Sequence, residues 1–328
     1  MTLRVLVTGV AGFIGYHVAN QLIRNGNAVL GIDSINSYYD QNLKKSRLSM
    51  LENLVNFSYE IFDLVDAEKV LEATKKFQPT HIVHLAAQAG VRYSLQNPQA
   101  YINANVSGFL SVLEACRAYS VEHLIYASSS SVYGANTKVP FSETDRVEQP
   151  VSLYAATKRS NELMAQTYAH LFGIPQSGLR FFTVYGPWGR PDMAYHIFTK
   201  AILEGRQIEL FNHGRMERDF TYIDDVVEAI VRLLGKPPNS FGMEAAPHIV
   251  YNIGNHTPVK LERFIQIISE KTGRSANKVY RPMQLGDVVA TYANVDRLMA
   301  AVDFAPRTSL EDGLGRFVDW YKDYYRDL

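Results

Sequence analysis

The first 180 residues of the chain alternate short apolar runs with longer amphipathic stretches. Residues 3–7 form a short run rich in branched apolar side chains, which is typical of a buried strand. Residues 13–24 then carry apolar side chains at helical spacing and end at Asn25-Gly26, a helix C-terminal signal. The same order repeats, and we expect further strands at 28–32, 55–61, 80–86, 122–128 and 176–182 and helices at 66–76, 98–119 and 153–172.

Strands and helices that alternate at this spacing predict an α/β fold built on a doubly wound parallel Rossmann sheet. Right-handed crossovers place the ligand of such a sheet at the carboxyl ends of its strands. We therefore expect a binding site along that edge, where the sequence places Gly9, Asp33, Asp63, Ala86 and Ser128.

The regular alternation weakens after Tyr185, where prolines interrupt the chain repeatedly. Residues 220–234 and 249–253 still look like elements that return to the main sheet. An aromatic-rich stretch at 316–325 has the spacing of a helix that packs on a core. We predict a Rossmann domain formed by 1–186 with returning segments 219–235 and 249–254, and a smaller, discontinuous C-terminal substrate domain formed by 187–218 and 255–328.

Size and charge restrict the class of protein. A chain of 328 residues is long enough for about two domains. Its 33 Lys and Arg balance 33 Asp and Glu, so no basic field attracts nucleic acid or an anionic membrane. The single Cys116 excludes an intrachain disulfide and fits a buried helix position in a reducing compartment. With no signal peptide or membrane-spanning run in the sequence, we expect a cytoplasmic protein, and we predict no metal site.

The segment that follows the first strand contains three glycines, Gly9, Gly12 and Gly15. Glycines let the backbone approach a phosphate, and the N-terminus of the next helix favours an anion. The spacing G-x2-G-x2-G differs from the standard dinucleotide fingerprint G-x-G-x2-G, so an ordinary tight turn remains the alternative. The second expected strand, which ends at Asp33, favours a dinucleotide pyrophosphate as the ligand of this turn.

Asp33 lies 18 residues beyond Gly15, at the end of the second expected strand. A carboxylate in this place binds the adenosine ribose hydroxyls of a dinucleotide. It also repels a 2′-phosphate, and the neighbouring Ser34 offers no cation to offset that repulsion. The sequence therefore favours NAD over NADP, with a simple turn acid as the alternative role of Asp33.

Tyr154 and Lys158 stand four residues apart on an expected helix, and so share one face. A free phenol has a pKa of about 10, too high for a base at neutral pH. A nearby ammonium and a positive nicotinamide ring both favour the phenolate. Tyr154 is the only one of 20 tyrosines with Lys four residues on, which favours a general base with its activator over an ordinary amphipathic helix.

The glycine turn, a run of serines at 128–131 and the Tyr-x3-Lys pair together resemble the extended short-chain dehydrogenases/reductases. Longer segments narrow the resemblance to the UDP-glucuronate 4-epimerases, and it extends over essentially the whole chain. These segments are GIDSINSYYD from residue 31, LAAQAGVRYS from 85, RFFTVYGPWGRPDM from 180, MERDFTYIDD from 216 and MQLGDV from 283.

The resemblance implies roles for particular positions. The catalytic set is Tyr154 as base, Lys158 as its partner and Ser129 as the supporting hydroxyl. The residues implied for NAD are Gly9, Gly12, Phe13, Ile14, Gly15, Asp33, Asn36, Ser37, Asp63, Leu64, Leu85, Ala86, Ala87, Gln88, Tyr154 and Lys158. Those implied for the UDP-sugar are Ser129, Ser130, Ser131, Thr183, Arg190, Phe211, Arg218, Asp287, Arg92 and Arg281.

The chain also departs from the family pattern. Ser129 stands where close relatives often have Thr, and Trp188 replaces a frequent Arg. Gln284 stands where related UDP-galactose epimerases carry a phosphate-binding Arg, a part for which Arg281 is a candidate. Surface ion pairing is the alternative role of Arg92, Arg190 and Arg281.

The implied reaction is C4 epimerisation of UDP-glucuronate to UDP-galacturonate through a transient 4-keto sugar, with NAD reduced and regenerated. Two rivals are a UDP-glucuronate decarboxylase and a UDP-N-acetylhexosamine 4-epimerase. Related decarboxylases have Glu just before Val-Tyr-Gly, where this chain has Ser131, which favours the epimerase. A non-catalytic NAD-sensing module is the rival from another class, and an intact Tyr-x3-Lys pair argues against it. The resemblance also implies a homodimer formed by the helices at 98–119 and 153–172.

Overall fold

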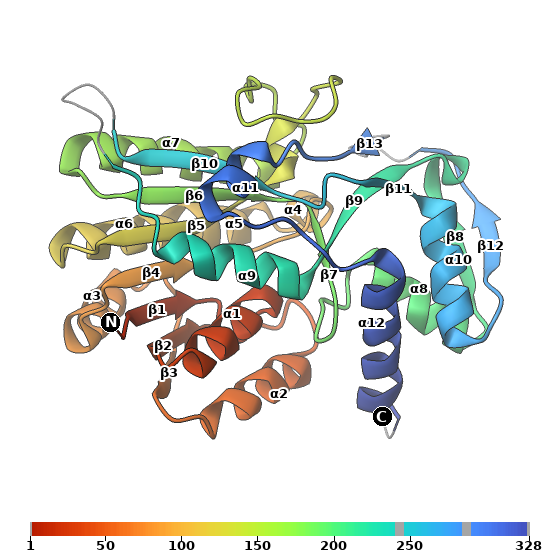
Figure 1. The fold of residues 1–328 in the computed structure, drawn as a ribbon, viewed down its shortest axis with the longest axis horizontal. Coiled ribbons are helices and arrows are strands. Elements are labelled where there is room, and N and C mark those ends of the chain that lie inside the picture. Colours follow the sequence, from red (N-terminus) through yellow and green to blue (C-terminus); the bar gives the residue numbers. More distant parts are fainter. Residues whose placement is uncertain (1, 240–245, 284–289, 327–328) are drawn as a thin grey trace.

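A seven-stranded parallel sheet forms the centre of the protein (Figure 1). The computed structural model describes residues 2–239, 246–283 and 290–326. The order of the strands across the sheet is β10 (His248–Ile253), β6 (Gln176–Phe181), β5 (His123–Ser129), β4 (His81–His84), β1 (Arg4–Thr8), β2 (Ala28–Asp33) and β3 (Phe57–Ile61). The order reverses at β1, as in a doubly wound Rossmann sheet, so the predicted fold class is confirmed.

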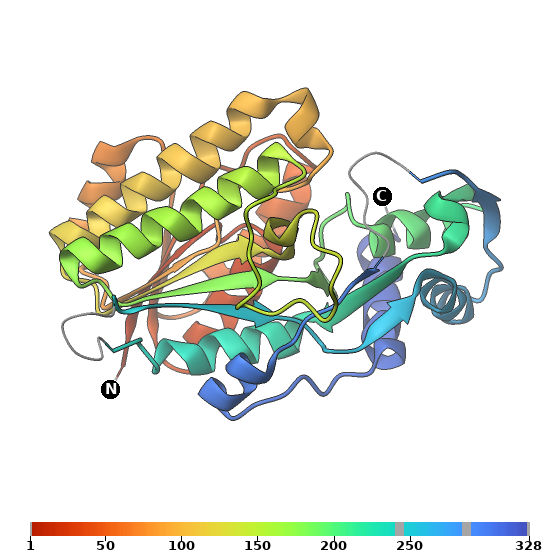
Figure 2. The same cartoon turned by 90° about the horizontal axis from the view of Figure 1, so that it is seen from above.

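Helices cover both faces of the sheet, which explains its apolar strands. On β1, Val5 and Val7 pack into one hydrophobic cluster while Leu6 between them packs into another on the opposite face. Figure 2 shows α6 and α7 on one face and α9 on the other. The first face carries α3 (Ala67–Phe77), α6 (Gly108–Ala118) and α7 (Leu153–Phe172), and the second carries α1 (Phe13–Arg24), α2 (Gln41–Glu52), α9 (Ile223–Leu234) and α11 (Asp296–Val302).

A second group of elements packs beyond the carboxyl ends of the strands (Figure 1). Its small sheets are β7 (Thr183–Tyr185), β9 (Glu217–Tyr222), β11 (Pro258–Lys260) and β13 (Ala290–Thr291), and β8 (Gln207–Leu210) with β12 (Asn277–Tyr280). Its helices are α8 (Ala194–Leu203), α10 (Leu261–Thr272) and α12 (Leu310–Tyr324). The predicted aromatic helix at 316–325 thus lies in α12, where Phe317 and Tyr321 are buried, as expected.

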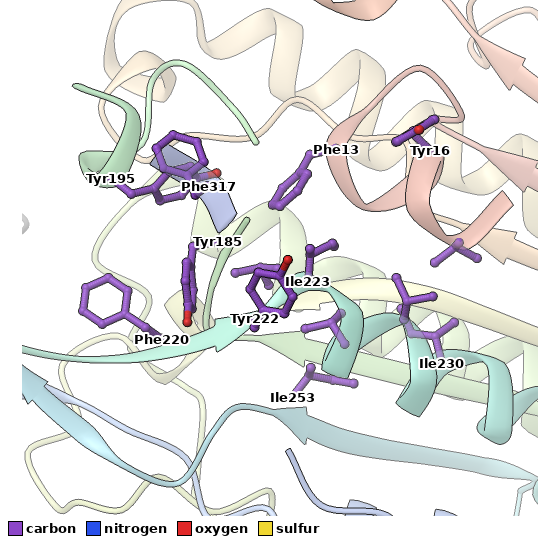
Figure 3. Packing of buried hydrophobic residues seen from close by; sticks show 14 of the residues in the cluster. Phe13, Tyr16, Tyr185, Tyr195, Phe220, Tyr222, Ile223, Ile230, Ile253 and Phe317 are labelled. Atoms are coloured by element: carbon purple, nitrogen blue, oxygen red, sulfur yellow. The ribbon is translucent and has the colours of Figure 1, made fainter. Parts of the chain in front are cut away.

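One continuous hydrophobic cluster joins the two groups of elements. Figure 3 shows part of it, from Phe13 and Tyr16 of α1 through Tyr222 of β9 to Phe317 of α12. Because a single core extends across the junction, the second group is held firmly against the edge of the main sheet where the ligand site was predicted.

Two element predictions need correction. Residues 98–119 are not one helix: α5 (Pro98–Tyr101) leads into a π-helix, η1 (Ile102–Ser107), before α6 begins. Phe220 belongs to β9 in the small sheet, not to the main sheet, because its ring stacks on Phe264 of α10 at 4.2 Å. Strand β10, by contrast, returns to the main sheet beside β6. The described residues also form three short elements, α4 (Tyr93–Gln96), η2 (Ser130–Tyr133) and η3 (Phe211–Gly214).

Candidate active site

The glycine turn lies between β1 and α1 and has no room for side chains. Gly9 adopts a φ of 74°, and a Cβ on it would lie 2.7 Å from the backbone nitrogen of Ala86. A Cβ on Gly12 would lie 2.9 Å from the carbonyl oxygen of Gly9, and one on Gly15 would collide with the same oxygen. The turn therefore presents bare backbone at the start of α1, as an anion-binding turn requires.

A pocket opens at this turn and collects residues from the ends of several strands. Eleven of the predicted site residues line it, ten from the NAD set and one from the sugar set: Gly9, Gly12, Phe13, Asp33, Asn36, Asp63, Leu64, Ala86, Ala87, Gln88 and Arg190. Its other lining residues were not among the predicted site residues: Ile32, Ser34, Tyr38, Tyr39, Lys44, Phe62, Ala89 and Ala104. Six members of the NAD set lie outside this lining: Ile14, Gly15, Ser37, Leu85, Tyr154 and Lys158.

Asp33 closes β2 and is fixed by two backbone hydrogen bonds. Its carboxylate accepts from the N–H of Ala11 at 3.0 Å and of Ile35 at 2.8 Å. Lys44 of α2 approaches from the other side and donates to the side-chain oxygen of Asn36 at 2.6 Å. Burial lowers the pKa of Lys44 to about 8, which the charge of Asp33 opposes. The pocket thus contains a cation that the sequence did not reveal, although it is bonded to Asn36.

Tyr154 and Lys158 lie in the first turns of α7, beside the end of β5. Lys158 is buried and donates to the carbonyl oxygen of Ala127 at 2.9 Å. Burial lowers its pKa to about 7. Burial also raises the pKa of Tyr154, while a hydrogen bond with Ser129 and the charge of Arg190 lower it. The sequence predicted a lowered pKa for Tyr154, which the protein alone does not produce, because burial outweighs those two contacts.

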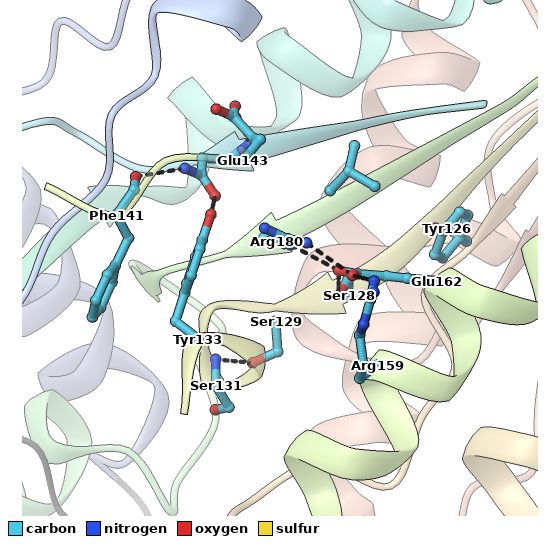
Figure 4. A network of polar contacts seen from close by, with 12 residues as sticks. Tyr126, Ser128, Ser129, Ser131, Tyr133, Phe141, Glu143, Arg159, Glu162 and Arg180 are labelled. Carbon is cyan, nitrogen blue, oxygen red and sulfur yellow. Dashed lines mark hydrogen bonds and ion pairs between the residues drawn. The ribbon is translucent and has the colours of Figure 1, made fainter. Parts of the chain in front are cut away.

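Helix α7 faces three consecutive residues of β5 with side chains spaced four apart, and Figure 4 shows the last of these contacts, between Glu162 and Ser128. Lys158 donates to the carbonyl of Ala127, and Tyr154 lies beside Ser129, whose side chain lowers the pKa of the phenol. Glu162 completes the series by accepting from the hydroxyl of Ser128 at 2.6 Å. The helix and the strand are thereby fixed in register at the end where Ser129 and Tyr154 meet.

Glu162 is itself held by two arginines. Arg180 of β6 donates to its two oxygens at 2.8 and 2.9 Å, and Arg159 donates at 2.9 Å. Burial raises the pKa of Glu162, but the bonds and charge of Arg180 bring it below its ordinary value. Arg180 also lies 4.9 Å over the ring of Tyr133 in η2, the helix that follows Ser129 (Figure 4). The Glu162–Arg180 ion pair therefore contacts the serine segment 128–131 at its first residue, Ser128, and just beyond its end, at Tyr133.

Asn105 is a site-supporting residue that the sequence prediction missed. It lies in the π-helix η1, exchanges hydrogen bonds with the backbone of Gln88 at 2.8 and 3.0 Å, and donates to Thr157 of α7 at 3.0 Å. Its carbonyl accepts from Asn161 at 2.6 Å. A π-turn often marks a functional site, and an Asn inside an otherwise apolar helix face was the available signal.

The predicted sugar ligands come from several separate segments. Ser130 and Ser131 begin η2, with the N–H of Ser131 bonded to Ser129 at 3.1 Å, and Thr183 begins β7. Arg92 lies 5.4 Å over the ring of Phe211. The others are Arg218 on β9, which donates to the carbonyl of Glu217, and Arg281 after β12, which pairs with Glu209 at 2.9 Å. Asp287 and Gln284 lie outside the described residues.

Arg190 forms an ion pair with Asp192 and lines the pocket. Its backbone N–H donates to the hydroxyl of Tyr195 at 3.0 Å, and Tyr38 donates to Asp192 at 3.1 Å. Burial opposes the charge of Arg190, yet Asp192 holds its pKa above the ordinary value. The ion pair with Asp192 therefore fixes the Arg190 side chain at the pocket lined by the predicted NAD residues.

Among the residues that the structure describes, no group of three or more His, Cys, Asp or Glu side chains is arranged to hold a metal ion. No helix in the same part of the chain is long and apolar enough to cross a membrane. Cys116 is buried on α6, as predicted.

Comparison with known proteins places the chain in a family. Residues 5–254 match the model of the NAD dependent epimerase/dehydratase family. Protein CapI of Staphylococcus aureus is 52% identical over 99% of this chain and 100% of its own length. A Rhizobium meliloti (strain 1021) protein named Probable UDP-glucuronate 4-epimerase is 48% identical over 99% and 98%.

The solved structures agree. A UDP-glucuronic acid 4-epimerase from Bacillus cereus, crystallised with UDP-glucuronic acid and NAD, superposes with a TM-score of 0.90 at 33% identity, covering 98% of this chain and 99% of that one. The glycine turn, the strand-end pocket and the Tyr154–Lys158 pair are thus found in a chain that belongs to the NAD dependent epimerase/dehydratase family.

Proposed function

We propose that this protein catalyses the NAD-dependent epimerisation of UDP-glucuronate at C4 to UDP-galacturonate. The observation that carries the proposal is Tyr154 beside Ser129 and Lys158 at the end of β5, on a fold similar over its whole length to a UDP-glucuronic acid 4-epimerase. The name of the Rhizobium meliloti relative supports the same substrate.

The residues present fit NAD. The glycine turn leaves backbone exposed where a Cβ would collide, and Asp33 stands at the expected ribose position. The two cations among the described lining residues already have partners: Lys44 is bonded to Asn36, and Arg190 is paired with Asp192. Asp33, Asn36 and Ser37 would hold the adenosine ribose and Asp63 and Leu64 the adenine. Bound NAD would take up the C4 hydride and return it to the opposite face of the sugar.

The protein's own groups would handle the proton. Tyr154 would accept the proton of the C4 hydroxyl, and Ser129 would hydrogen-bond the same oxygen as it becomes a carbonyl. Lys158 would leave the Ala127 carbonyl to hold the nicotinamide ribose, and its charge would then favour the Tyr154 phenolate. The 4-keto sugar must rotate to present its other face before the second half-reaction. The protein must therefore bind the UDP part tightly and the sugar weakly.

The carboxylate of the substrate distinguishes this reaction from decarboxylation. A ketone at C4 next to a carboxylate on C5 makes a β-keto acid, which loses CO₂ when the carboxylate bond aligns with the carbonyl. We propose that Ser130, Ser131 and Thr183 hold the carboxylate out of that alignment. Arg190, Arg218, Arg92, Arg281, Phe211 and Asp287 are proposed to bind the rest of the UDP-sugar, within a substrate domain formed by 187–218 and 255–328.

We also propose a homodimer in the cytoplasm. Helix α7 exposes Leu163, Leu171 and Phe172, at 53%, 61% and 45%, and the neighbouring segment of η1 and α6 exposes Ile102 and Leu110, at 38% and 42%. Neighbouring exposed apolar side chains on two packed helices support a self-complementary interface. Light scattering of the purified protein measures the assembly directly.

The test of the function is incubation of purified protein with UDP-glucuronate and no added NAD, followed by NMR of the products. We expect UDP-galacturonate if NAD remains bound, and the same product on addition of NAD if it does not. A UDP-pentose with release of CO₂ would instead identify a decarboxylase. Turnover of UDP-N-acetylglucosamine or UDP-glucose at the same rate as UDP-glucuronate would show that the carboxylate does not determine substrate specificity.

A further inference from the structure

Arg47 of α2 is fully buried and connects three parts of the protein. Its guanidinium donates to the carbonyl of Ala11 in the glycine turn and to the hydroxyl of Tyr39, both at 2.8 Å. It also donates to the carbonyl of Trp188 at 2.6 and 3.1 Å, and to that of Gly189 at 3.3 Å. No sequence motif pointed to a role for Arg47.

None of the groups that Arg47 contacts carries a negative charge that would neutralise its guanidinium. All of its acceptors are backbone carbonyls or a phenol, and no carboxylate of the described residues lies within ion-pair distance of it. A buried cation is stable only when it is paired with an anion or fully hydrogen-bonded, and pairing greatly reduces the cost of its desolvation. The glycine turn that Arg47 touches is the proposed site of a dinucleotide diphosphate, which is an anion.

The segment on the other side of Arg47 is held in an unusual conformation. Trp188 has a φ of +61°, a left-handed backbone that a bulky residue rarely adopts. Its ring packs on Trp320 and Tyr324 of α12 at 5.3 and 5.0 Å and on Tyr16 of α1 at 6.0 Å. Backbone strain of this kind persists only where the surroundings determine it, and here the two hydrogen bonds from Arg47 to the Trp188 carbonyl supply much of that constraint.

Two residues beyond Trp188 the chain reaches Arg190, which lines the pocket. His17 of α1 bonds the carbonyl of Pro187 at 3.0 Å, so the segment is held to the main sheet's helices on both sides of Trp188. If the glycine turn shifts, Arg47 would move with it and would therefore displace the segment that carries Arg190.

We propose that Arg47 is a positioning residue that links the cofactor-binding turn to the Arg190 segment, and that the negative charge of bound NAD balances its buried cation. Cofactor binding then fixes Trp188 and Arg190 in the geometry that receives the nucleotide sugar. The inference rests on the proposed function, because it takes NAD as the occupant of the turn.

Trp188 offers a direct readout. The chain has two tryptophans, Trp188 and Trp320, so Trp320→Phe leaves one emitter. The buried indole nitrogen of Trp320 has no hydrogen-bond partner, and the change therefore removes no polar contact. In this background we compare Arg47→Met, which removes the cation, and Arg47→Lys, which keeps the charge but cannot reach the turn and the Trp188 carbonyl together. Lys45→Met, an exposed position on the same helix, is the matched control for charge alone.

The measurements are the NAD dissociation constant by calorimetry and the change of Trp188 emission when NAD is added to nucleotide-free protein. We expect Arg47→Met to weaken NAD at least tenfold and to abolish the emission change. Arg47→Lys should bind NAD within a few-fold of the parent, lose most of the emission change and raise KM for UDP-glucuronate more than it lowers kcat. Lys45→Met should match the parent in all three.

The proposal is overturned if folded Arg47→Met binds NAD with parental affinity, or if Arg47→Lys keeps the full emission change. Should Arg47→Met fail to fold, Arg47→Lys alone decides the link. If these variants refute the link but the parent still epimerises UDP-glucuronate, the proposed function is unaffected. A parent that binds NAD, shows the Arg47-dependent emission change and converts no UDP-glucuronate would refute the proposed function and leave the link standing.

Discussion

At the scale of single residues, the proposed chemistry depends on groups whose properties the fold changes. Burial raises the pKa of Tyr154 and lowers that of Lys158 to about 7, so the two pKa values move apart and burial favours the neutral form of each group. Each is held by β5, through Ser129 and through the carbonyl of Ala127. A proton can therefore be exchanged near neutral pH only once a ligand brings the lysine's charge to the phenol.

Tyr154→Phe tests the base. Only the phenolic oxygen is lost, so the fold and NAD binding should remain while turnover falls about 10²–10⁴-fold, the usual contribution of a general acid–base group. Steady-state kinetics with UDP-glucuronate and calorimetric NAD binding measure the two effects. Tyr168→Phe, which removes a hydroxyl bonded to Glu114 on the far part of α7, is the control and should retain full activity. Parental turnover in Tyr154→Phe would refute the assignment.

Asp33→Asn tests the choice of cofactor. Loss of the carboxylate removes the repulsion of a 2′-phosphate, and Lys44 in the same pocket is then free of that negative neighbour. We expect weaker NAD binding and stronger NADP binding, so that the ratio of the two affinities falls about tenfold or more, roughly 1.4 kcal/mol. Asp63→Asn, in the same pocket at the proposed adenine side, should weaken both cofactors alike. An unchanged ratio in Asp33→Asn would make Asp33 a turn residue only.

At the scale of elements, the register between α7 and β5 sets the catalytic geometry. Residues 154, 158 and 162 of the helix face residues 129, 127 and 128 of the strand. Arg180 anchors Glu162 from the next strand (Figure 4). When Lys158 turns to a ligand, the Glu162–Ser128 bond remains to hold the helix in place.

Ser128→Ala tests this register. It removes the hydroxyl and leaves the Glu162–Arg180 ion pair, and a lost hydrogen bond to a charged group costs about 1.5–3 kcal/mol. We expect kcat to fall about tenfold with little change in NAD affinity, because small displacements of reacting groups are costly. Ser177→Ala, which breaks a buried bond to His123 of 2.9 Å elsewhere on the sheet, should lower stability without lowering kcat. Equal kcat values in the two variants would show that the bond is structural only.

At the scale of the whole molecule, the protein buries an unusual set of neutral histidines. Burial lowers the pKa of His17, His123, His196 and His248 to about 4 and that of His84 to about 3. They occupy both the main sheet and the second group of elements, so their titration bears on the stability of the entire chain.

The expected consequence is loss of stability in mild acid. Below about pH 6.5 the unfolded chain binds protons on these imidazoles while the folded protein does not, down to about pH 4. The free energy of unfolding should therefore fall over that window, by up to about 1.4 kcal/mol per pH unit for each histidine. Urea unfolding between pH 7.5 and 4.5 measures the slope.

His196→Phe removes one of these groups from within an aromatic cluster and should flatten the slope by about one proton. His170→Gln, at an exposed position on α7, should leave the slope unchanged. A slope that is the same in His196→Phe as in the parent would contradict the assignment of acid sensitivity to the buried imidazoles.

The sequence by itself determined the elements with strong periodicity and the residues that carry local motifs. Helices α1 and α7 begin and end at the predicted residues, because caps and apolar spacing are local properties of the chain. The glycine turn, Asp33 and the Tyr154–Lys158 pair were found for the same reason, since each motif depends on neighbours within about 20 residues.

Only the tertiary structure decided what distant segments do to one another. The π-turn at Asn105 is bonded by residues from other segments: Gln88, 17 residues away, donates to its side chain, and Asn161, 56 residues away, donates to its backbone carbonyl. Strand β9 lies in the small sheet because the ring of its Phe220 stacks on Phe264 of α10. Lys44 and Arg47 on the unpredicted helix α2 reached the pocket and the Trp188 segment for the same physical reason: burial and hydrogen bonding across 8 to 142 residues override any local pattern.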